Sequence, residues 1–275
     1  MNLSFKIMLV SVSLVSFASC SKDPSYAKDQ PENNVFSTAE NFKLSSKSEA
    51  IVFKAAGDIN PALEEFRALL GTLNSAPNAT GGRREINWDG VPATFTNNNL
   101  FPGDFFGSAD PLAANGRKRG LISTTPGVGF RISDNDFVDV KPEYDKLFNT
   151  FSPTKTFVAN GSTITDNFFK VPGTNVDASV QGFGVVFSSV NNASSTSLEF
   201  YDGDSLLGTF KVPNNGTSNV AGFSFLGVYF PNEKVTRVRI ISGSAPLSST
   251  QDDLSDGGGE DIVIMDDFIY SEPRN

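Results

Sequence analysis

The feature that most constrains the fold is a series of short β-type segments separated by turn residues. Seven candidate strands follow one another in the second half of the 275-residue chain: Thr163–Val171, Gly182–Val190, Ser197–Tyr201, Ser205–Val212, Ala221–Phe230, Val235–Ser242 and Asp261–Tyr270. The sequence Asp202-Gly203-Asp204 predicts a tight hairpin, because Asp-Gly supplies the left-handed conformations that such a turn needs. Short strands at this spacing predict a mainly β domain, an antiparallel β-sandwich of the jelly-roll type.

One helix is expected before these strands. Apolar side chains recur at helical spacing from Leu63 to Leu70, and Asp58 offers an N-cap ahead of them. Pro61 suits the first turn of a helix. The pattern predicts a single N-terminal helix over about 60–71 that covers an open end of the sandwich.

Two further strands are expected, with a long irregular connection between them. Arg84–Trp88 and Val128–Ser133 have β-type sequences, whereas Val91–Thr125 shows no regular pattern and contains the basic segment Arg117-Lys118-Arg119. Connections of this length are usually functional or mobile. The basic segment is interpreted mainly as a solvated loop, with binding of an anion as the alternative.

The start of the chain has the pattern of an export signal. Lys6 precedes the apolar run Ile7–Phe17, which is followed by small residues and by Cys20, the only cysteine. The run is shorter than the about 20 residues that a membrane-spanning helix needs, and serines interrupt it. The segment resembles the signal of bacterial lipoproteins, and this resemblance implies that Cys20 is lipidated. An ordinary secretory signal cleaved near Ala18 is the alternative, since Phe17 is a less usual residue in a lipobox.

The expected domain organisation follows from this signal. Residues 1–19 are the signal peptide, and the polar, proline-containing residues 20–50 form a flexible tether. Residues 51–275 form a single β-sandwich domain. The lipid anchor implies a location in the bacterial cell envelope, at the outer membrane, with the membrane as a partner.

The chain has no histidine and carries a net charge of −9. The absence of histidine excludes a Ser-His-Asp triad, a Cys-His pair and His-ligated zinc or iron, and a single cysteine cannot form a disulfide within the chain. The acidic balance argues against nucleic acid as a partner, because phosphate neutralisation needs clustered Lys and Arg. Any acid–base catalyst would have to be Asp, Glu, Lys or Tyr.

The only tryptophan lies in a polar segment that suits contact with a sugar. A sugar ring stacks on an indole, and neighbouring polar side chains hydrogen-bond its hydroxyl groups. The candidate ligand-binding residues are Arg84, Asn87, Trp88 and Asp89. The alternative is that Trp88 is a residue at the edge of the core.

Acidic residues crowd around a glycine-rich segment in the last part of the sequence. Calcium takes about six to eight oxygen ligands, and a loop such as Gly257–Gly259 lets carbonyl groups turn inward. A structural calcium site is one interpretation, and a solvated acidic loop is the other. The candidate ligands are Asp252, Asp253, Asp256, Asp261 and Asp266, with Glu260 and Asp267 nearby in the sequence. No other cofactor is expected.

The last expected strand places two carboxylates in an apolar run. Asp266 and Asp267 are adjacent in Ile262–Tyr270, so strand alternation directs them to opposite faces. A buried carboxylate needs a cation or several hydrogen-bond donors. Arg237 and Arg239 are the expected salt-bridge partners, with a bound cation as the alternative.

A catalytic role has little support in the sequence. Glycoside hydrolysis needs two carboxylates that flank one bond, and the sequence does not give their separation. The carboxylates on or beside strands are Glu85, Asp89, Glu199 and Asp267. An enzyme is therefore not expected.

Three segments resemble parts of exported bacterial β-sandwich proteins of uncharacterised function. The segments are 83–91, 182–190 and 265–273, and the likeness spans roughly residues 60–273. It implies the fold and export and transfers no catalytic residue. Together, these observations predict a surface-exposed lipoprotein that acts as a non-catalytic module for binding carbohydrate. A structural or adhesion protein of the cell surface is the alternative, and a carboxylate-dependent glycan hydrolase is the third hypothesis.

Overall fold

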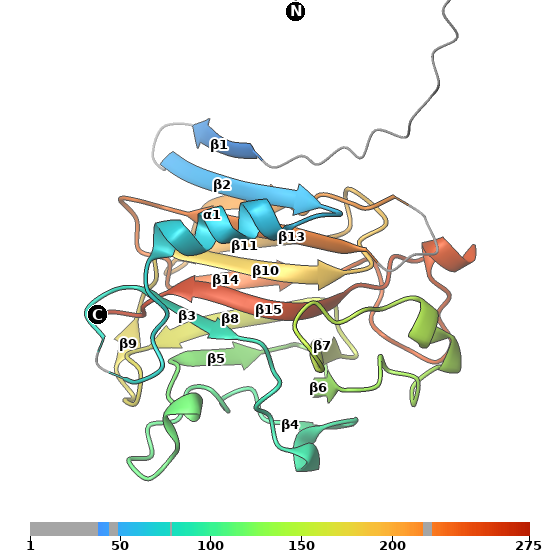
Figure 1. Ribbon diagram of the computed structural model, residues 1–275, viewed down its shortest axis with the longest axis horizontal. Coiled ribbons are helices and arrows are strands. Elements are labelled where there is room, and N and C mark those ends of the chain that lie inside the picture. The colour runs from blue at the N-terminus through green and yellow to red at the C-terminus, as the bar shows by residue number, and fades with distance from the viewer. Residues whose placement is uncertain (1–37, 44–48, 78, 217–221) are drawn as a thin grey trace, which may run out of the picture. The chain divides into compact units, whose positions relative to one another are not determined.

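The computed structural model describes residues 38–43, 49–77, 79–216 and 222–275 (Figure 1). The expected signal peptide, Cys20 and most of the expected tether lie outside these residues. The prediction of a lipid anchor at Cys20 therefore falls outside the described part of the chain. Within the described ranges, no helix is both long enough and apolar enough to cross a bilayer.

The described chain forms two antiparallel sheets (Figure 1). The larger sheet has nine described strands in the order β1-β2-β13-β10-β15-β7-β6-β4, with β3 beside β15. These strands are β1 (Thr38–Lys43), β2 (Glu49–Ala56), β3 (Arg83–Ile86), β4 (Asn98–Phe101), β6 (Gly129–Ser133), β7 (Thr156–Asn160), β10 (Gly182–Ser188), β13 (Phe223–Tyr229) and β15 (Ile264–Ser271). The smaller sheet has six described strands in the order β12-β11-β14-β8-β5, with β9 beside β8. Its strands are β5 (Leu121–Thr124), β8 (Ile164–Lys170), β9 (Asp177–Ala178), β11 (Ser197–Asp202), β12 (Ser205–Lys211) and β14 (Arg237–Ile241).

Eight of these strands have the winding of a jelly roll, which confirms the predicted fold class. β7 pairs with β15, β8 with β14, β10 with β13, and β11 with β12, so the chain folds back on itself as one long hairpin. The hairpin is rolled so that its four pairs alternate between the two sheets. Gly203 has a φ of 57° in the turn between β11 and β12, as the Asp-Gly sequence predicts.

Phenylalanine dominates the interior between the two sheets. Phe183 and Phe268 of the larger sheet have ring centroids 5.5 Å apart, and Phe169 of the smaller sheet lies 6.0 Å from Phe183. All three side chains are almost fully buried. Since one cysteine cannot form an internal disulfide, this packing and the strand pairing stabilise the domain.

The described α-helix, α1 (Asn60–Leu70), covers the outer face of the larger sheet (Figure 1). Phe66 of α1 packs between Phe53 of β2 and Phe225 of β13, at centroid distances of 5.6 and 5.7 Å. The predicted packing helix is therefore confirmed, but it covers the outer face of the larger sheet and not an open end. The physical reason is that β2, β10, β13 and β15 present apolar side chains outward, and the apolar stripe of α1 buries them.

Most boundaries expected from the sequence agree with the structure. The seven expected strands correspond to β8 and to β10 through β15, with each boundary within three residues. The helix starts at Asn60, as expected, but its N-cap is Ile59 and not Asp58, and Ile59 makes no side-chain capping bond. The Asp58 carboxylate instead accepts a hydrogen bond from the backbone N–H of Asn60 at 3.2 Å.

The edges of the sheets differ from expectation. β1 and the first residues of β2 fall within 20–50, the expected tether, and β4 and β5 fall within Val91–Thr125, the connection expected to be irregular. In the described chain, β1 and β4 are the outermost strands of the larger sheet, and β12 and β5 are the outermost strands of the smaller one. Of these four, β12 was expected because it follows the Asp-Gly turn, whereas β1, β4 and β5 are short or polar and lack the alternation that marks a strand in sequence.

Candidate functional site

Trp88 lies in the core and is 2 % exposed. Its ring stacks on Phe157 with centroids 4.1 Å apart and an interplanar angle of 4°, and the rings of Phe106 and Phe268 contact it edge-on. The indole N–H donates to the carbonyl oxygen of Asp266 at 2.6 Å. A sugar ring was expected to stack on Trp88, but Phe157 already occupies a face of the indole and the side chain is almost fully buried.

The other three residues of this predicted glycan site also make internal bonds. Arg84 is fully buried and donates through Nε and Nη2 to the Glu272 carboxylate, at 2.7 Å in both cases. Asp89 Oδ1 accepts from the backbone N–H of Thr154 at 2.7 Å, and its Oδ2 accepts from Asn87 Nδ2 at 2.8 Å. These bonds fasten β3 and the following turn to their neighbours.

Two of the predicted calcium ligands are buried and hydrogen-bonded to protein groups. Asp253 Oδ2 accepts from the backbone N–H of Ile262 at 2.7 Å, and its Oδ1 accepts from Asn191 Nδ2 at 2.9 Å. Asp261 Oδ1 accepts from the backbone N–H of Asn191 at 2.9 Å. Burial raises the pKa of Asp261. These carboxylates act as acceptors that hold three loop segments together.

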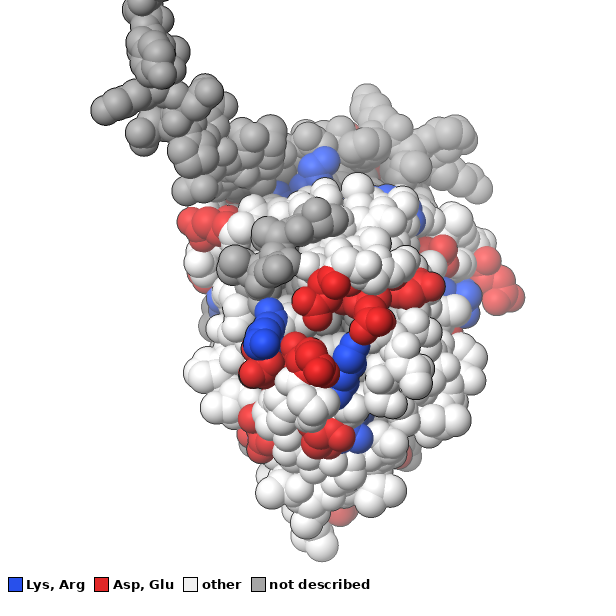
Figure 2. Space-filling model, turned by 90° about the vertical axis from the view of Figure 1, so that its right-hand side faces the viewer, with Lys and Arg blue, Asp and Glu red and all other residues white. Residues whose placement is uncertain are grey.

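The other three predicted ligands lie elsewhere. Asp252 and Asp256 are exposed around the 3-10 helix η4 (Leu254–Asp256), where Asp252 is ion-paired with Lys141. Figure 2 shows this side of the molecule, where acidic side chains gather together with several basic ones. Asp266 is buried in β15. Among the described residues, no group of three or more acidic side chains is arranged to hold a metal ion, so the predicted calcium site is not formed.

The carboxylates considered for hydrolysis are divided between the two sheets. Arg67 of α1 donates to Glu85 of β3 at 3.0 and 2.8 Å and lies 3.5 Å from the Asp267 carboxylate, outside the larger sheet. Glu199 lies in the smaller sheet, where it accepts a hydrogen bond from the Tyr201 hydroxyl at 2.5 Å. Two of the four candidates, Glu85 and Asp267, therefore lie together at Arg67, which contacts both carboxylates, whereas Glu199 belongs to the other sheet.

The outer face of the smaller sheet carries a row of large side chains that sequence reasoning did not single out as a site. Strand pairing aligns Tyr201 of β11, Arg237 of β14 and Phe168 of β8. The Arg237 guanidinium lies over the Tyr201 ring, 3.8 Å from its centroid, and Phe168 is 38 % exposed. Leu206 of β12 and Ile122 of β5 extend this outer row at its two ends. The row combines aromatic and apolar surface with one cation.

Arg239 and Asp166 lie beside the outer row, and Asp166 holds Arg237 of the outer row in place. Arg239 donates to both oxygens of Asp166, at 2.9 and 2.8 Å, and Arg237 donates to the same carboxylate at 3.2 Å. The expectation that these arginines pair with Asp266 and Asp267 is therefore wrong. The reason is that β14 points both guanidinium groups outward from the smaller sheet, whereas the two aspartates belong to the larger one.

A cavity of about 610 Å³ opens at the end of the outer row and is lined by Phe168, Thr236 and the β11–β12 turn. This volume lies within the range of small-molecule sites. Its charged lining residues are Asp177, Asp202, Asp204 and Arg237. Because three carboxylates face one guanidinium, the cavity favours neutral or cationic ligands over anions.

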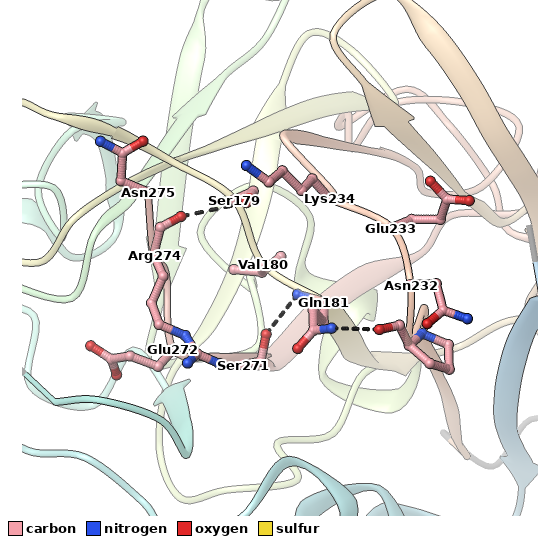
Figure 3. A pocket seen from close by; sticks show the side chains of 11 residues that line it. Ser179, Val180, Gln181, Asn232, Glu233, Lys234, Ser271, Glu272, Arg274 and Asn275 are labelled. Atoms are coloured by element: carbon pink, nitrogen blue, oxygen red, sulfur yellow. Dashed lines mark hydrogen bonds between the residues drawn. The ribbon is translucent and has the colours of Figure 1, made fainter.

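Two further cavities lie next to this one along the end of the sandwich. The first cavity shares Asp177 and Thr236 with a neighbouring cavity of about 170 Å³, which in turn shares Ser179 and Lys234 with a third of about 330 Å³. Figure 3 shows the third cavity between the segment that carries Lys234 and the last residues after β15. Its polar lining side chains include Ser179, Gln181, Asn232, Glu233, Lys234 and Arg274. We call these three neighbouring cavities, which share lining residues, the end groove.

Comparison with known proteins does not extend this description. No protein-family model, no curated protein and no solved structure matches the chain. The function is therefore inferred from the geometry of the outer row and the end groove.

Proposed function

We propose that the protein is a non-catalytic lipoprotein of the bacterial cell envelope that binds carbohydrate in the end groove. The observation that carries this proposal is the exposed ring of Phe168 beside a cavity of about 610 Å³. A sugar has an apolar C–H face and an edge of hydroxyl groups. Phe168 packs against the face, while Arg237 and Thr236 hydrogen-bond to the hydroxyl groups.

The charge of the groove supports a neutral glycan. Asp177, Asp202 and Asp204 line the first cavity, and the whole chain carries a net charge of −9, so an anionic polymer is repelled. Carboxylates are also good acceptors for sugar hydroxyl groups. Three neighbouring cavities in a row suit a chain of several sugar units better than a single unit.

The lipid anchor at Cys20 belongs to the same proposal. Its support is the signal-like sequence that precedes the only cysteine. In cells fed a labelled fatty acid, the protein should incorporate the label and fractionate with the outer membrane, and Cys20→Ser should abolish the incorporation. A soluble, unlabelled wild-type protein would instead support an ordinary secretory signal.

The decisive experiment is a glycan-array screen followed by calorimetric titration of the best neutral oligosaccharide. Phe168→Ala should weaken binding by about tenfold or more, because it removes the stacking surface. Leu112→Ala is the matched control, since Leu112 is 92 % exposed and does not line the groove. Equal affinity of the wild type and Phe168→Ala, or no glycan bound at all, would reject the proposal.

The same preparations test the alternatives. Release of reducing sugar from the bound oligosaccharide would support the hydrolase hypothesis, which needs a carboxylate pair. Binding to cell-surface protein in the absence of any glycan affinity would support the adhesion hypothesis.

A further inference from the structure

A separate cavity of about 300 Å³ lies between the turn after β3 and the connection that leads to β5. Its aromatic lining residues are Trp88, Phe105 and Phe106, and its charged ones are Arg117 and Arg119. None of its lining residues also lines the end groove. It is therefore a second site, independent of the one proposed for carbohydrate.

Protein contacts hold both guanidinium groups without neutralising them. Arg117 lies 4.6 Å over the centroid of Phe105 and donates through Nε to the carbonyl oxygen of the same residue at 3.4 Å. Arg119 donates through Nε to the carbonyl oxygen of Gly116 at 3.1 Å and through Nη1 to that of Glu85. Carbonyl groups accept these bonds, and neither arginine has a carboxylate partner among the described residues. The positive charge of both groups is therefore available to a ligand.

The charge of the cavity contrasts with that of the whole chain. Of the eleven residues that line it, two are basic and none is acidic, although the chain has 31 acidic and 22 basic residues. Two guanidinium groups in a concave site with aromatic walls attract an anion and can hold a carboxylate through charge-assisted hydrogen bonds. The walls are apolar, because Phe105 and Phe106 supply rings and Ile86 and Pro92 supply aliphatic surface.

We propose that this cavity binds a small organic carboxylate with a flat apolar ring. The carboxylate bonds to Arg117 and Arg119, and the ring packs against Phe105 and Phe106. A volume of about 300 Å³ lies at the lower end of the range for ligand sites, which limits the ligand to about one ring. This ligand differs in charge from the neutral glycan, so the two sites select different molecules.

Binding in this cavity can be followed by the fluorescence of Trp88. Trp88 is the only tryptophan of the chain and lines the cavity, so its fluorescence reports on an added ring. Titration of the wild type with benzoate should change this fluorescence and reach saturation. Acetate, which has the charge alone, and benzyl alcohol, which has the ring alone, should each bind at least about tenfold more weakly.

Substitution of the two arginines tests whether their guanidinium groups hold the carboxylate of benzoate. Arg117→Gln should weaken benzoate binding by about tenfold or more, and Arg119→Lys, which keeps a charge but loses the planar fork, should weaken it less. Lys211→Gln is the control for net charge, because Lys211 is exposed and donates to the carbonyl oxygen of Ser194 far from the cavity. Thermal melting of each variant checks that the fold is intact.

The outcomes separate this inference from the proposed function. Benzoate affinity that Phe168→Ala leaves unchanged and Arg117→Gln lowers supports an independent anion site. No saturable signal from benzoate, equal binding of acetate or of benzyl alcohol, or unchanged affinity in Arg117→Gln would overturn it. None of these results depends on whether the end groove binds a glycan.

Discussion

The carboxyl groups of Asp266 and Asp267 share one hydroxyl group, that of Ser152. The Ser152 Oγ atom lies 3.0 Å from Oδ1 of Asp266 and 2.6 Å from Oδ1 of Asp267. Alternation along a strand predicts opposite faces for two adjacent residues, so this shared contact contradicts the expectation from the sequence. Both side chains lie outside the larger sheet, where Asp267 also approaches Arg67 of α1.

A β-bulge in β15 accounts for this arrangement. Val185 of β10 pairs with Phe268 and Phe187 pairs with Met265, so Val186 alone stands opposite both aspartates. The extra residue shifts the alternation by one position, as bulges do. It keeps Met265 and Phe268 together in the core between the sheets while both carboxyl groups turn outward.

The pair should make stability depend on pH. Burial, and then the charge of Asp267, raises the pKa of Asp266 to about 9, and burial raises the pKa of Asp267 as well. A hydroxyl group has one proton to donate, so the second carboxyl is held best in its protonated form. The folded state then keeps a proton that the unfolded chain releases above its ordinary pKa of about 4. The free energy of unfolding should therefore fall as pH rises from about 4 to about 9 and level off above that.

Asp266→Asn tests this dependence, because the amide keeps the shape of the side chain and carries no charge. Urea unfolding at about pH 5 and about pH 9 should show a smaller loss of stability in the variant than in the wild type. Asp252→Asn is the control, since Asp252 is exposed. Parallel pH profiles for the wild type and Asp266→Asn would contradict the assignment.

The strands could be predicted from sequence because their causes are local. Alternating side chains and turn residues such as Gly203 act within a few positions, and they define β8 and β10 through β15 closely. The bulge at Asp266 and Asp267 could not be predicted in this way. It is set by the need to bury Met265 and Phe268 against the other sheet, which is a contact between distant segments.

The sites illustrate the same limit. Trp88 looks like a binding residue in its polar segment, yet Phe157 and Phe268, far away in the sequence, enclose it. The outer row was overlooked in the sequence although it is exposed. Phe168 precedes a buried Phe169 in β8, so strand alternation alone exposes one of the two rings. That signal is present in the sequence, but only strand pairing brings Phe168 beside Arg237.

Gly184 should be required by the packing of α1 on the larger sheet. A Cβ atom at this position would lie 2.9 Å from Cε1 of Phe66 and 3.0 Å from the Cα atom of Gly227, which is backbone and cannot rotate away. Gly184→Ala should therefore lower the free energy of unfolding by about 1–3 kcal/mol, measured by urea denaturation. Gly259→Ala is the matched control, since a Cβ atom there meets nothing within 4 Å. Equal losses of unfolding free energy in the two variants would show that Phe66 does not pack closely against Gly184.

Asp253 should stabilise the domain through its hydrogen bonds and without calcium. Its carboxylate accepts from Ile262 N–H at 2.7 Å, from Ser255 N–H at 2.8 Å and from Asn191 Nδ2 at 2.9 Å, so protein donors occupy both oxygens. Asp253→Ala leaves the buried N–H of Ile262 without an acceptor and should cost about 2–3 kcal/mol, whereas Asp252→Ala, at an exposed position, should change little. EDTA should leave the melting temperature of the wild type unchanged, and added calcium should not raise it. A fall in melting temperature on chelation, restored by calcium, would mean that these carboxylates hold a metal after all.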